Sequence, residues 1–197
     1  MDEPQPTAAF TGVVLAGGHS TRMGRDKAQI VLPNGRSLLD QALHTLRSAG
    51  ASELFVSVRQ GQSYGRPGTR EVADSAEGCG PLAGLVAALE AASSDRIVVL
   101  AVDLPAMSCE YLQKLAAIST TNCGAVPLRG GFFEPLAAVY PKLTAQSARN
   151  AFEQSRLSLQ SWVRKLAKNG LIQPTLIKPT ETGFFANWNR PASLPAS

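Results

Sequence analysis

The residues whose types and spacing are best suited to chemistry lie at 12–27 and read GVVLAGGHSTRMGRDK. A short apolar run leads into a loop with three glycines and three cations: Gly17, Gly18, Gly24, Arg22, Arg25 and Lys27. Glycines let backbone N–H groups approach phosphate oxygens, which a Cβ would block, and fixed cations match the negative charge of a triphosphate. The segment therefore predicts a cradle for the phosphates of a nucleotide.

Two familiar phosphate-binding motifs do not fit this loop. The Walker motif requires G-x-x-x-x-G-K-[ST], but Gly24 is followed by Arg25 and Asp26, and Ala28 stands where that motif has a magnesium-binding hydroxyl. The dinucleotide motif G-x-G-x-x-G is absent as well, because the glycines fall at positions 17, 18 and 24. A different kind of nucleotide loop is indicated.

The elements that must position this loop alternate between β-rich and helical runs. Short apolar runs predict strands at 13–15, 54–58, just before Asp74, and 97–102. Helical spacing and end signals predict helices between Ser37 and Gly50, and at 81–92, 143–154 and 158–169. Runs at 125–128 and 136–140 flank two glycines and indicate a hairpin or a return strand.

This alternation predicts an α/β fold, with a Rossmann-like, doubly wound, mostly parallel sheet and helices on both faces. At 197 residues and 44% hydrophobic, the chain is expected to be a single domain, with residues 1–9 as a flexible tail. Ligands of such sheets lie beyond the carboxyl ends of the strands. The 15–27 loop, Asp74 and Asp103 all fall at such ends, so we expect them to share one crevice.

Asp103, in the sequence AVDLP, is the candidate magnesium ligand. Mg²⁺ commonly takes only one or two protein carboxylates and completes its coordination with phosphates and water. Asp74 precedes a second glycine-containing segment, GCGPLAG at 78–84, in which Gly84 serves either the ligand or close packing. From placement alone, each aspartate has an alternative as a turn residue. Asp26 either touches the ligand or orients Lys27.

The composition excludes several classes of protein. The net charge is +4, but no run of five or more Lys and Arg occurs, so dispersed surface charge is favoured over a nucleic-acid face. The odd number and wide spacing of Cys79, Cys109 and Cys123 predict neither a zinc site nor a disulfide framework. The N-terminus lacks the features of a secretory signal, and no apolar stretch approaches the roughly 20 residues that span a bilayer. A cytoplasmic protein without nucleic-acid or membrane partners is expected.

The segment from Leu15 to Lys27 resembles, without a gap, the L-A-G-G-x-S-x-R-M-G-x-D-K signature of nucleotidyltransferases, in particular the molybdenum cofactor guanylyltransferases of the MobA family. The GPLAG segment at 80–84, the V-D-x-P pattern at 102–105 and the C-terminal FFANWNRPASL are also similar to that family. The resemblance implies transfer of GMP from GTP to molybdenum-bound molybdopterin, with Mg²⁺ as cofactor and pyrophosphate as the second product. Its L-A-G-G form implies GTP, since the related cytidylyltransferases usually read L-A-A-G.

The resemblance also assigns roles to residues. Arg22, Lys27 and Asp103 would be catalytic, with both cations on the departing pyrophosphate and Asp103 on the metal. The nucleotide would meet Leu15, Ala16, Gly17, Gly18, Lys27, Ser57, Asp74, Gly80, Pro81, Leu82 and Asp103. The pterin substrate would meet Glu134, Asn187 and Asn189. Two residues depart from the family pattern, because Ser57 stands where an asparagine is frequent and Arg190 replaces the usual threonine.

Partners implied by the resemblance are a molybdenum insertion protein and the acceptor molybdoenzymes or their chaperones. Two alternatives stay open at this point. One is a cytidylyltransferase or sugar-phosphate nucleotidyltransferase on the same scaffold, and the other is a non-catalytic GTP-binding module for cofactor delivery.

Overall fold

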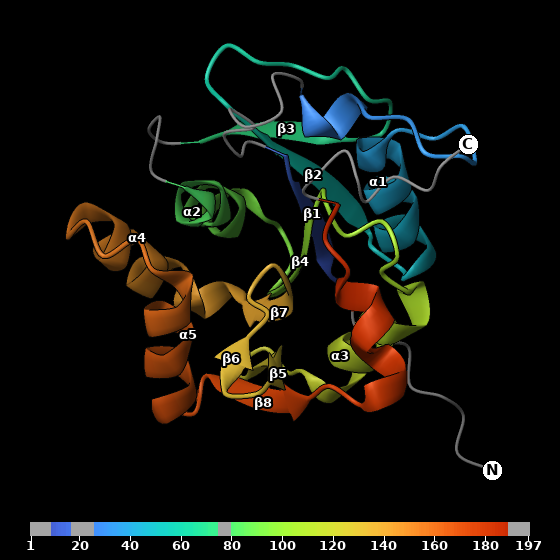
Figure 1. The fold of residues 1–197 in the computed structure, drawn as a ribbon. Helices are drawn as coiled ribbons and strands as arrows, with labels where there is room; N and C mark the ends of the chain where they lie inside the picture. Colours follow the sequence, from blue (N-terminus) through green and yellow to red (C-terminus); the bar gives the residue numbers. More distant parts are fainter. Residues whose placement is uncertain (1–8, 17–25, 75–79, 189–197) are drawn as a thin grey trace.

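The structure is a computed structural model that describes residues 9–16, 26–74 and 80–188 (Figure 1). Gly17, Gly18, Arg22 and Asn189, which the sequence places in the site, lie outside the described residues. Cys79 and most of the expected N-terminal tail also lie outside them.

The described strands form one sheet in the order β3-β2-β1-β4-β7-β5-β6, with β8 paired to β5. Their bounds are β1 Thr11–Leu15, β2 Glu53–Val58, β3 Arg70–Ala73, β4 Arg96–Ala101, β5 Gly124–Arg129, β6 Phe132–Phe133, β7 Ala137–Pro141 and β8 Ile172–Leu176. Strands β3, β2, β1 and β4 are mutually parallel, and β5 pairs in parallel with β8. Strand β7 runs antiparallel between β4 and β5, so it is the return strand that the sequence indicated.

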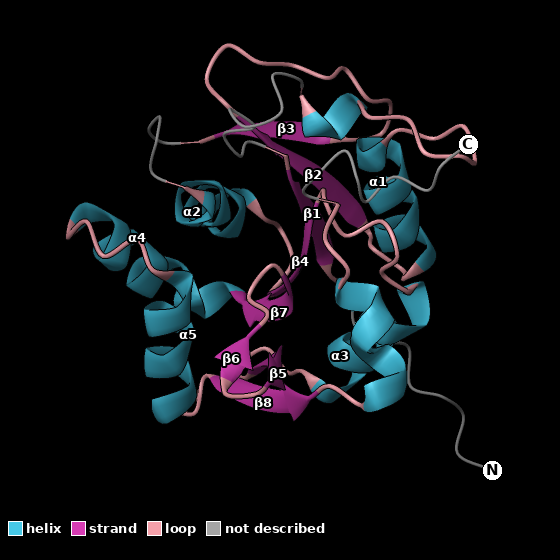
Figure 2. Cartoon of the chain, viewed as in Figure 1, coloured by secondary structure: helices cyan, strands magenta, loops and turns pink. Residues whose placement is uncertain are grey.

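In the described part of the chain, five α-helices cover the two faces of this sheet (Figure 2). They are α1 Leu38–Ser48, α2 Pro81–Ala91, α3 Cys109–Ile118, α4 Ala145–Glu153 and α5 Leu159–Lys168. Helices α1 and α3 lie on one side, and α2, α4 and α5 on the other. The predicted α/β fold with a mostly parallel sheet is confirmed.

The central strands β1 and β4 are buried on both faces. In β1, Val14 belongs to the core on the α1 side, while Val13 and Leu15 belong to the core on the α2 side. Alternation of this kind requires apolar residues at every position, which explains the continuous apolar runs of β1 and β4. These two strands therefore form the buried centre of the sheet, and the site lies at their carboxyl ends.

Helix α1 begins as its sequence predicts. The Ser37 hydroxyl accepts a hydrogen bond from the Asp40 amide at 3.0 Å and thereby caps the first turn. Beyond the other end, Gly50 has φ +99°, a conformation that glycine adopts without steric cost. Helix α2 likewise has Pro81 in its first turn, preceded by Gly80 at φ +68°.

Two of the longer elements, helix α3 and strand β8, were not predicted from the sequence. Helix α3 begins after Ser108, which caps it by accepting from the Tyr111 amide. Strand β8 reads IQPTL, and its polar residues and proline obscure the alternation of apolar and polar residues that is typical of an edge strand. Three short 3₁₀ helices, Lys27–Gln29, Lys142–Thr144 and Pro179–Phe185, complete the described elements. Within the described ranges, every helix is too short or too polar to traverse a lipid bilayer.

Candidate active site

A cavity of about 180 Å³ lies at the carboxyl ends of the central parallel strands. Its lining brings together eight residues that the sequence assigned to the site: Leu15, Ala16, Lys27, Ser57, Asp74, Gly80, Pro81 and Asp103. Four further residues complete the lining: Gly84, Ala101, Val102 and Leu136. The expected crevice therefore exists, and segments far apart in the sequence form it.

One wall of the cavity carries an ion pair. The Lys27 Nζ lies 3.5 Å from Asp103 Oδ2, and the two side chains are 21% and 22% exposed. Lys27 opens the 3₁₀ helix after the predicted phosphate loop, while Asp103 follows β4. The Asp103 carbonyl is fixed because it accepts from the Trp188 amide at 3.0 Å. Partial exposure leaves both charges within reach of a bound ligand, so this wall suits an anion together with a cation.

The opposite wall carries a second carboxylate in a different setting. The Ser57 hydroxyl, at the end of β2, donates to Asp74 Oδ1 at 2.5 Å, and Ser57 is only 1% exposed. Burial raises the pKa of the Asp74 carboxyl, although the Ser57 hydrogen bond and the Arg59 charge oppose that rise. The serine thus holds the aspartate in place, which sequence reasoning had not assigned to it.

Helix α2 packs closely against Ser57 and Asp74 at Gly84. A Cβ at Gly84 would collide with Ser57 Oγ and would lie 2.8 Å from Asp74 Oδ1. The close-packing interpretation of Gly84 therefore applies, because only glycine lets the helix approach so nearly. Leu82, in contrast, is fully buried in the core on the α2 side and is not among the residues that line the cavity. Its assignment to the nucleotide stays a prediction.

The backbone at the end of β1 also forms hydrogen bonds to neighbouring strands. The Ala16 amide donates to the Ser57 carbonyl at 3.2 Å, and the Leu15 carbonyl accepts from the Val102 amide at 3.3 Å. These bonds continue the sheet to the rim of the cavity. A ligand at this position would therefore meet the Ala16 carbonyl rather than its amide.

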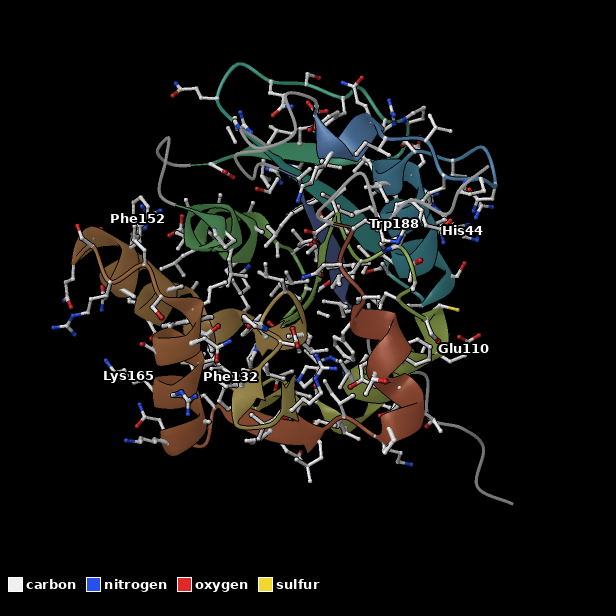
Figure 3. The ribbon with its side chains drawn as sticks, in the orientation of Figure 1. His44, Glu110, Phe132, Phe152, Lys165 and Trp188 are labelled. Carbon is white, nitrogen blue, oxygen red and sulfur yellow. The ribbon has the colours of Figure 1, made fainter. Side chains whose placement is uncertain are left out.

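Two of the residues assigned to the second substrate, Glu134 and Asn187, are described by the structure, and neither lines the cavity. Glu134 lies between β6 and β7, where burial raises the pKa of its carboxyl, and its Oε1 is 3.9 Å from Arg129 Nη2. Asn187 is exposed and precedes Trp188, whose side chain packs against the core on the α1 and α3 side (Figure 3). The Trp188 amide bond to Asp103 brings this C-terminal segment beside the end of β4.

A mostly parallel sheet with a Lys–Asp ion pair and a second carboxylate at its carboxyl edge is typical of nucleotide-binding α/β enzymes that transfer phosphorus groups. The MobA-like NTP transferase domain matches residues 12–169 of the chain. The chain therefore belongs to the MobA-like NTP transferase family.

One sequence relative agrees with this membership, and two solved structures share the fold. A protein of Opitutus terrae named probable molybdenum cofactor guanylyltransferase is 37% identical over 187 residues, which cover 93% of this chain and 92% of that protein. Molybdopterin-guanine dinucleotide biosynthesis protein A from Archaeoglobus fulgidus has a similar fold, with TM-score 0.74, 23% identity, and 94% and 95% of the two chains covered. A manganese complex from Mycobacterium tuberculosis shares the fold at TM-score 0.56 and 20% identity, covering 86% and 88%.

Proposed function

We propose that the protein transfers GMP from GTP to molybdenum-bound molybdopterin, which yields molybdopterin guanine dinucleotide and pyrophosphate. The observation that carries this proposal is the Lys27–Asp103 ion pair on the wall of a cavity at the carboxyl ends of β1 and β4. The name of the Opitutus terrae relative, which matches nearly the whole chain, supports the choice of substrates.

The reaction needs little covalent participation from the protein. The terminal phosphate of molybdopterin, already ionised at neutral pH, attacks the α-phosphorus of GTP in line. A new P–O bond forms as the bond between the α-phosphorus and the bridging oxygen of the β-phosphate breaks. The Lys27 ammonium neutralises charge that develops on the departing pyrophosphate, and no general base is required. Arg22 would assist Lys27 in this role.

The residues on the cavity wall fit a divalent cation held with the substrate. In the described ranges, no group of three or more His, Cys, Asp or Glu could hold a metal by itself. Beside Lys27, Asp103 supplies a partly exposed carboxylate, which is the hard oxygen ligand that Mg²⁺ shares with phosphates. A cation bound there would polarise the α-phosphate. The manganese complex of a protein with this fold is consistent with such a site.

The nucleotide would lie between the two carboxylates, with its phosphates near Lys27 and its nucleoside toward Ala16, Asp74 and Gly80. The L-A-G-G sequence that begins at Leu15 supports guanine, although Gly17 and Gly18 lie outside the described residues. Molybdopterin would approach from the side of Glu134, Asn187 and Asn189. We place this reaction in the cytoplasm, with a molybdenum insertion protein and acceptor molybdoenzymes or their chaperones as partners.

The test is pyrophosphate release by the purified protein with Mg²⁺, a molybdopterin source, and either GTP or CTP. We expect release with GTP only, and only when molybdopterin is present. Release with CTP would show that the base assignment is wrong. GTP binding without any release would favour the non-catalytic module instead.

A further inference from the structure

A polar network joins the residue before Lys27 to the loop that follows β2, away from the cavity lining. Asp26 Oδ2 accepts hydrogen bonds from the Tyr64 hydroxyl and from Gln62 Nε2, both at 2.9 Å. Gln62 Nε2 also donates to the Tyr64 hydroxyl oxygen at 2.8 Å. The three side chains therefore form a closed triangle around one carboxylate oxygen, and bonds to an ionised acceptor are the stronger kind.

The other carboxylate oxygen of Asp26 controls the backbone of Lys27. Asp26 Oδ1 accepts from the Ala28 amide at 3.0 Å and caps the 3₁₀ turn that Lys27 opens. The Asp26 carbonyl accepts from the Gln29 amide at 3.1 Å, which closes the same turn. A rotation of the Asp26 side chain would therefore move the turn from which the Lys27 side chain extends toward Asp103.

Tyr64 is itself a rigid anchor for this carboxylate. Its side chain is buried in the core on the α1 side, and its amide donates to Glu71 Oε1 of β3 at 2.6 Å. Arg66 binds the Tyr64 carbonyl at 3.0 Å and both carboxylate oxygens of Asp40 in α1, at 2.7 and 3.3 Å. Burial, followed by the Asp26 interactions, raises the pKa of Tyr64 well above its usual value, so the hydroxyl stays a donor.

We propose that Tyr64 and Gln62 are positioning residues for Lys27, which act through Asp26 to aim its ammonium at the phosphate end of the cavity. This inference rests on the proposed role of Lys27 in the reaction. Neither Tyr64 nor Gln62 lines the cavity. Their effect is therefore on orientation, which matters most when charge develops in the transition state.

Tyr64→Phe removes the hydroxyl and keeps the buried ring. We expect kcat to fall about tenfold while KM for GTP changes by less than about twofold, because a transition-state interaction is lost. Tyr111→Phe is the matched control, since the Tyr111 hydroxyl is also buried but has no hydrogen-bond partner in the described part of the chain. That control should retain the wild-type kcat and melting temperature.

A double-mutant cycle separates positioning from a general structural role. If Tyr64 acts through Lys27, Tyr64→Phe will cause no further loss of kcat in a Lys27→Ala background, whereas independent effects multiply. Multiplied losses, or a wild-type kcat for Tyr64→Phe alone, would overturn the inference.

A second readout does not depend on turnover. Hydrogen exchange of the Ala28 amide, followed by NMR, should quicken about tenfold in Tyr64→Phe and stay unchanged in Tyr111→Phe. Unchanged exchange in both variants would contradict the network itself. If the wild type releases no pyrophosphate, the proposed function fails, and the exchange experiment still decides whether Tyr64 holds this turn.

Discussion

The two carboxylates of the cavity follow parallel strands of one sheet, yet their surroundings are opposite. Asp103 faces the Lys27 ammonium, and both side chains are about one-fifth exposed. Asp74 accepts a hydrogen bond from the buried Ser57 hydroxyl, and burial raises the pKa of its carboxyl. One carboxylate therefore belongs to an ion pair, and the other accepts a hydrogen bond from a buried hydroxyl.

The different surroundings of Asp103 and Asp74 indicate that the two carboxylates lie at opposite ends of one ligand site. Strands β3 and β4 are separated in the sheet by β2 and β1, which amounts to three strand spacings or about 14 Å. A nucleotide has its charged phosphates at one end and its uncharged base and ribose at the other. The Asp103 end suits the phosphates with a divalent cation, whereas Asp74 suits N–H or O–H donors of the nucleoside.

Substitution of Asp103 should have the largest effect, because it destroys the charged end. We expect Asp103→Ala to lower kcat about a thousandfold or more, since an electrostatic contact to the reacting phosphates is lost. Asp95→Ala is the matched control, an exposed aspartate just before the amino end of the same strand β4. Pyrophosphate release measures activity, and thermal melting checks that the fold is intact. Full activity in Asp103→Ala would refute the assignment.

Gly84→Ala should disturb only the Asp74 end. The added methyl group collides with Ser57 Oγ and crowds Asp74 Oδ1, so we expect KM for GTP to rise about tenfold with a smaller change in kcat. Glycine to alanine in a helix ordinarily stabilises by about 1 kcal/mol, so a lower melting temperature would itself report the collision. Gly183→Ala is the control, because a Cβ there meets nothing within 4 Å. An unchanged KM in Gly84→Ala would contradict a contact between Asp74 and the nucleotide.

The charged end of the site could be predicted from sequence better than its supports. Lys27 and Asp103 stand at the end of a glycine loop and of a continuous apolar strand, and parallel strands bring such ends together. The hydrogen bonds that Asp26 accepts from Gln62 and Tyr64 span 36 and 38 residues. No local periodicity encodes a contact of that separation, so these residues emerged only from the structure.

Several helices and strands outside the charged end were also difficult to predict from the sequence. Helix α2 was predicted, whereas the burial of the Leu82 side chain in the core emerged only from the structure. Helix α3 and strand β8 were missed, the latter because Pro174 and its polar neighbours resemble a loop in sequence. Strand β8 forms because β5 offers it a complete parallel register from Gly124 to Leu128. Tertiary pairing there outweighs weak local propensity.

The smallest predicted effect concerns stability and separates the two carboxylates without any substrate. The pKa of Asp74 is raised above the ordinary value of 3.8, so the folded state binds its proton more tightly than the unfolded chain does. Below pH 3.8 the carboxyl is neutral in both states and contributes nothing. As the pH rises through the folded-state pKa, the protein must ionise a partly buried group, and stability is lost.

Asp74→Asn stays neutral at every pH and keeps an oxygen that can accept from Ser57. We therefore expect its melting temperature at pH 7 to exceed that of the wild type by about 2 °C, with the difference vanishing near pH 3. Asp40→Asn should behave oppositely, because hydrogen bonds from Ser37 and Arg66 outweigh burial and lower the pKa of Asp40. Melting curves from pH 3 to pH 7 measure both. A less stable Asp74→Asn at pH 7 would mean that the ionised Asp74 stabilises the fold, and the contrast between the two ends would then rest on Lys27 alone.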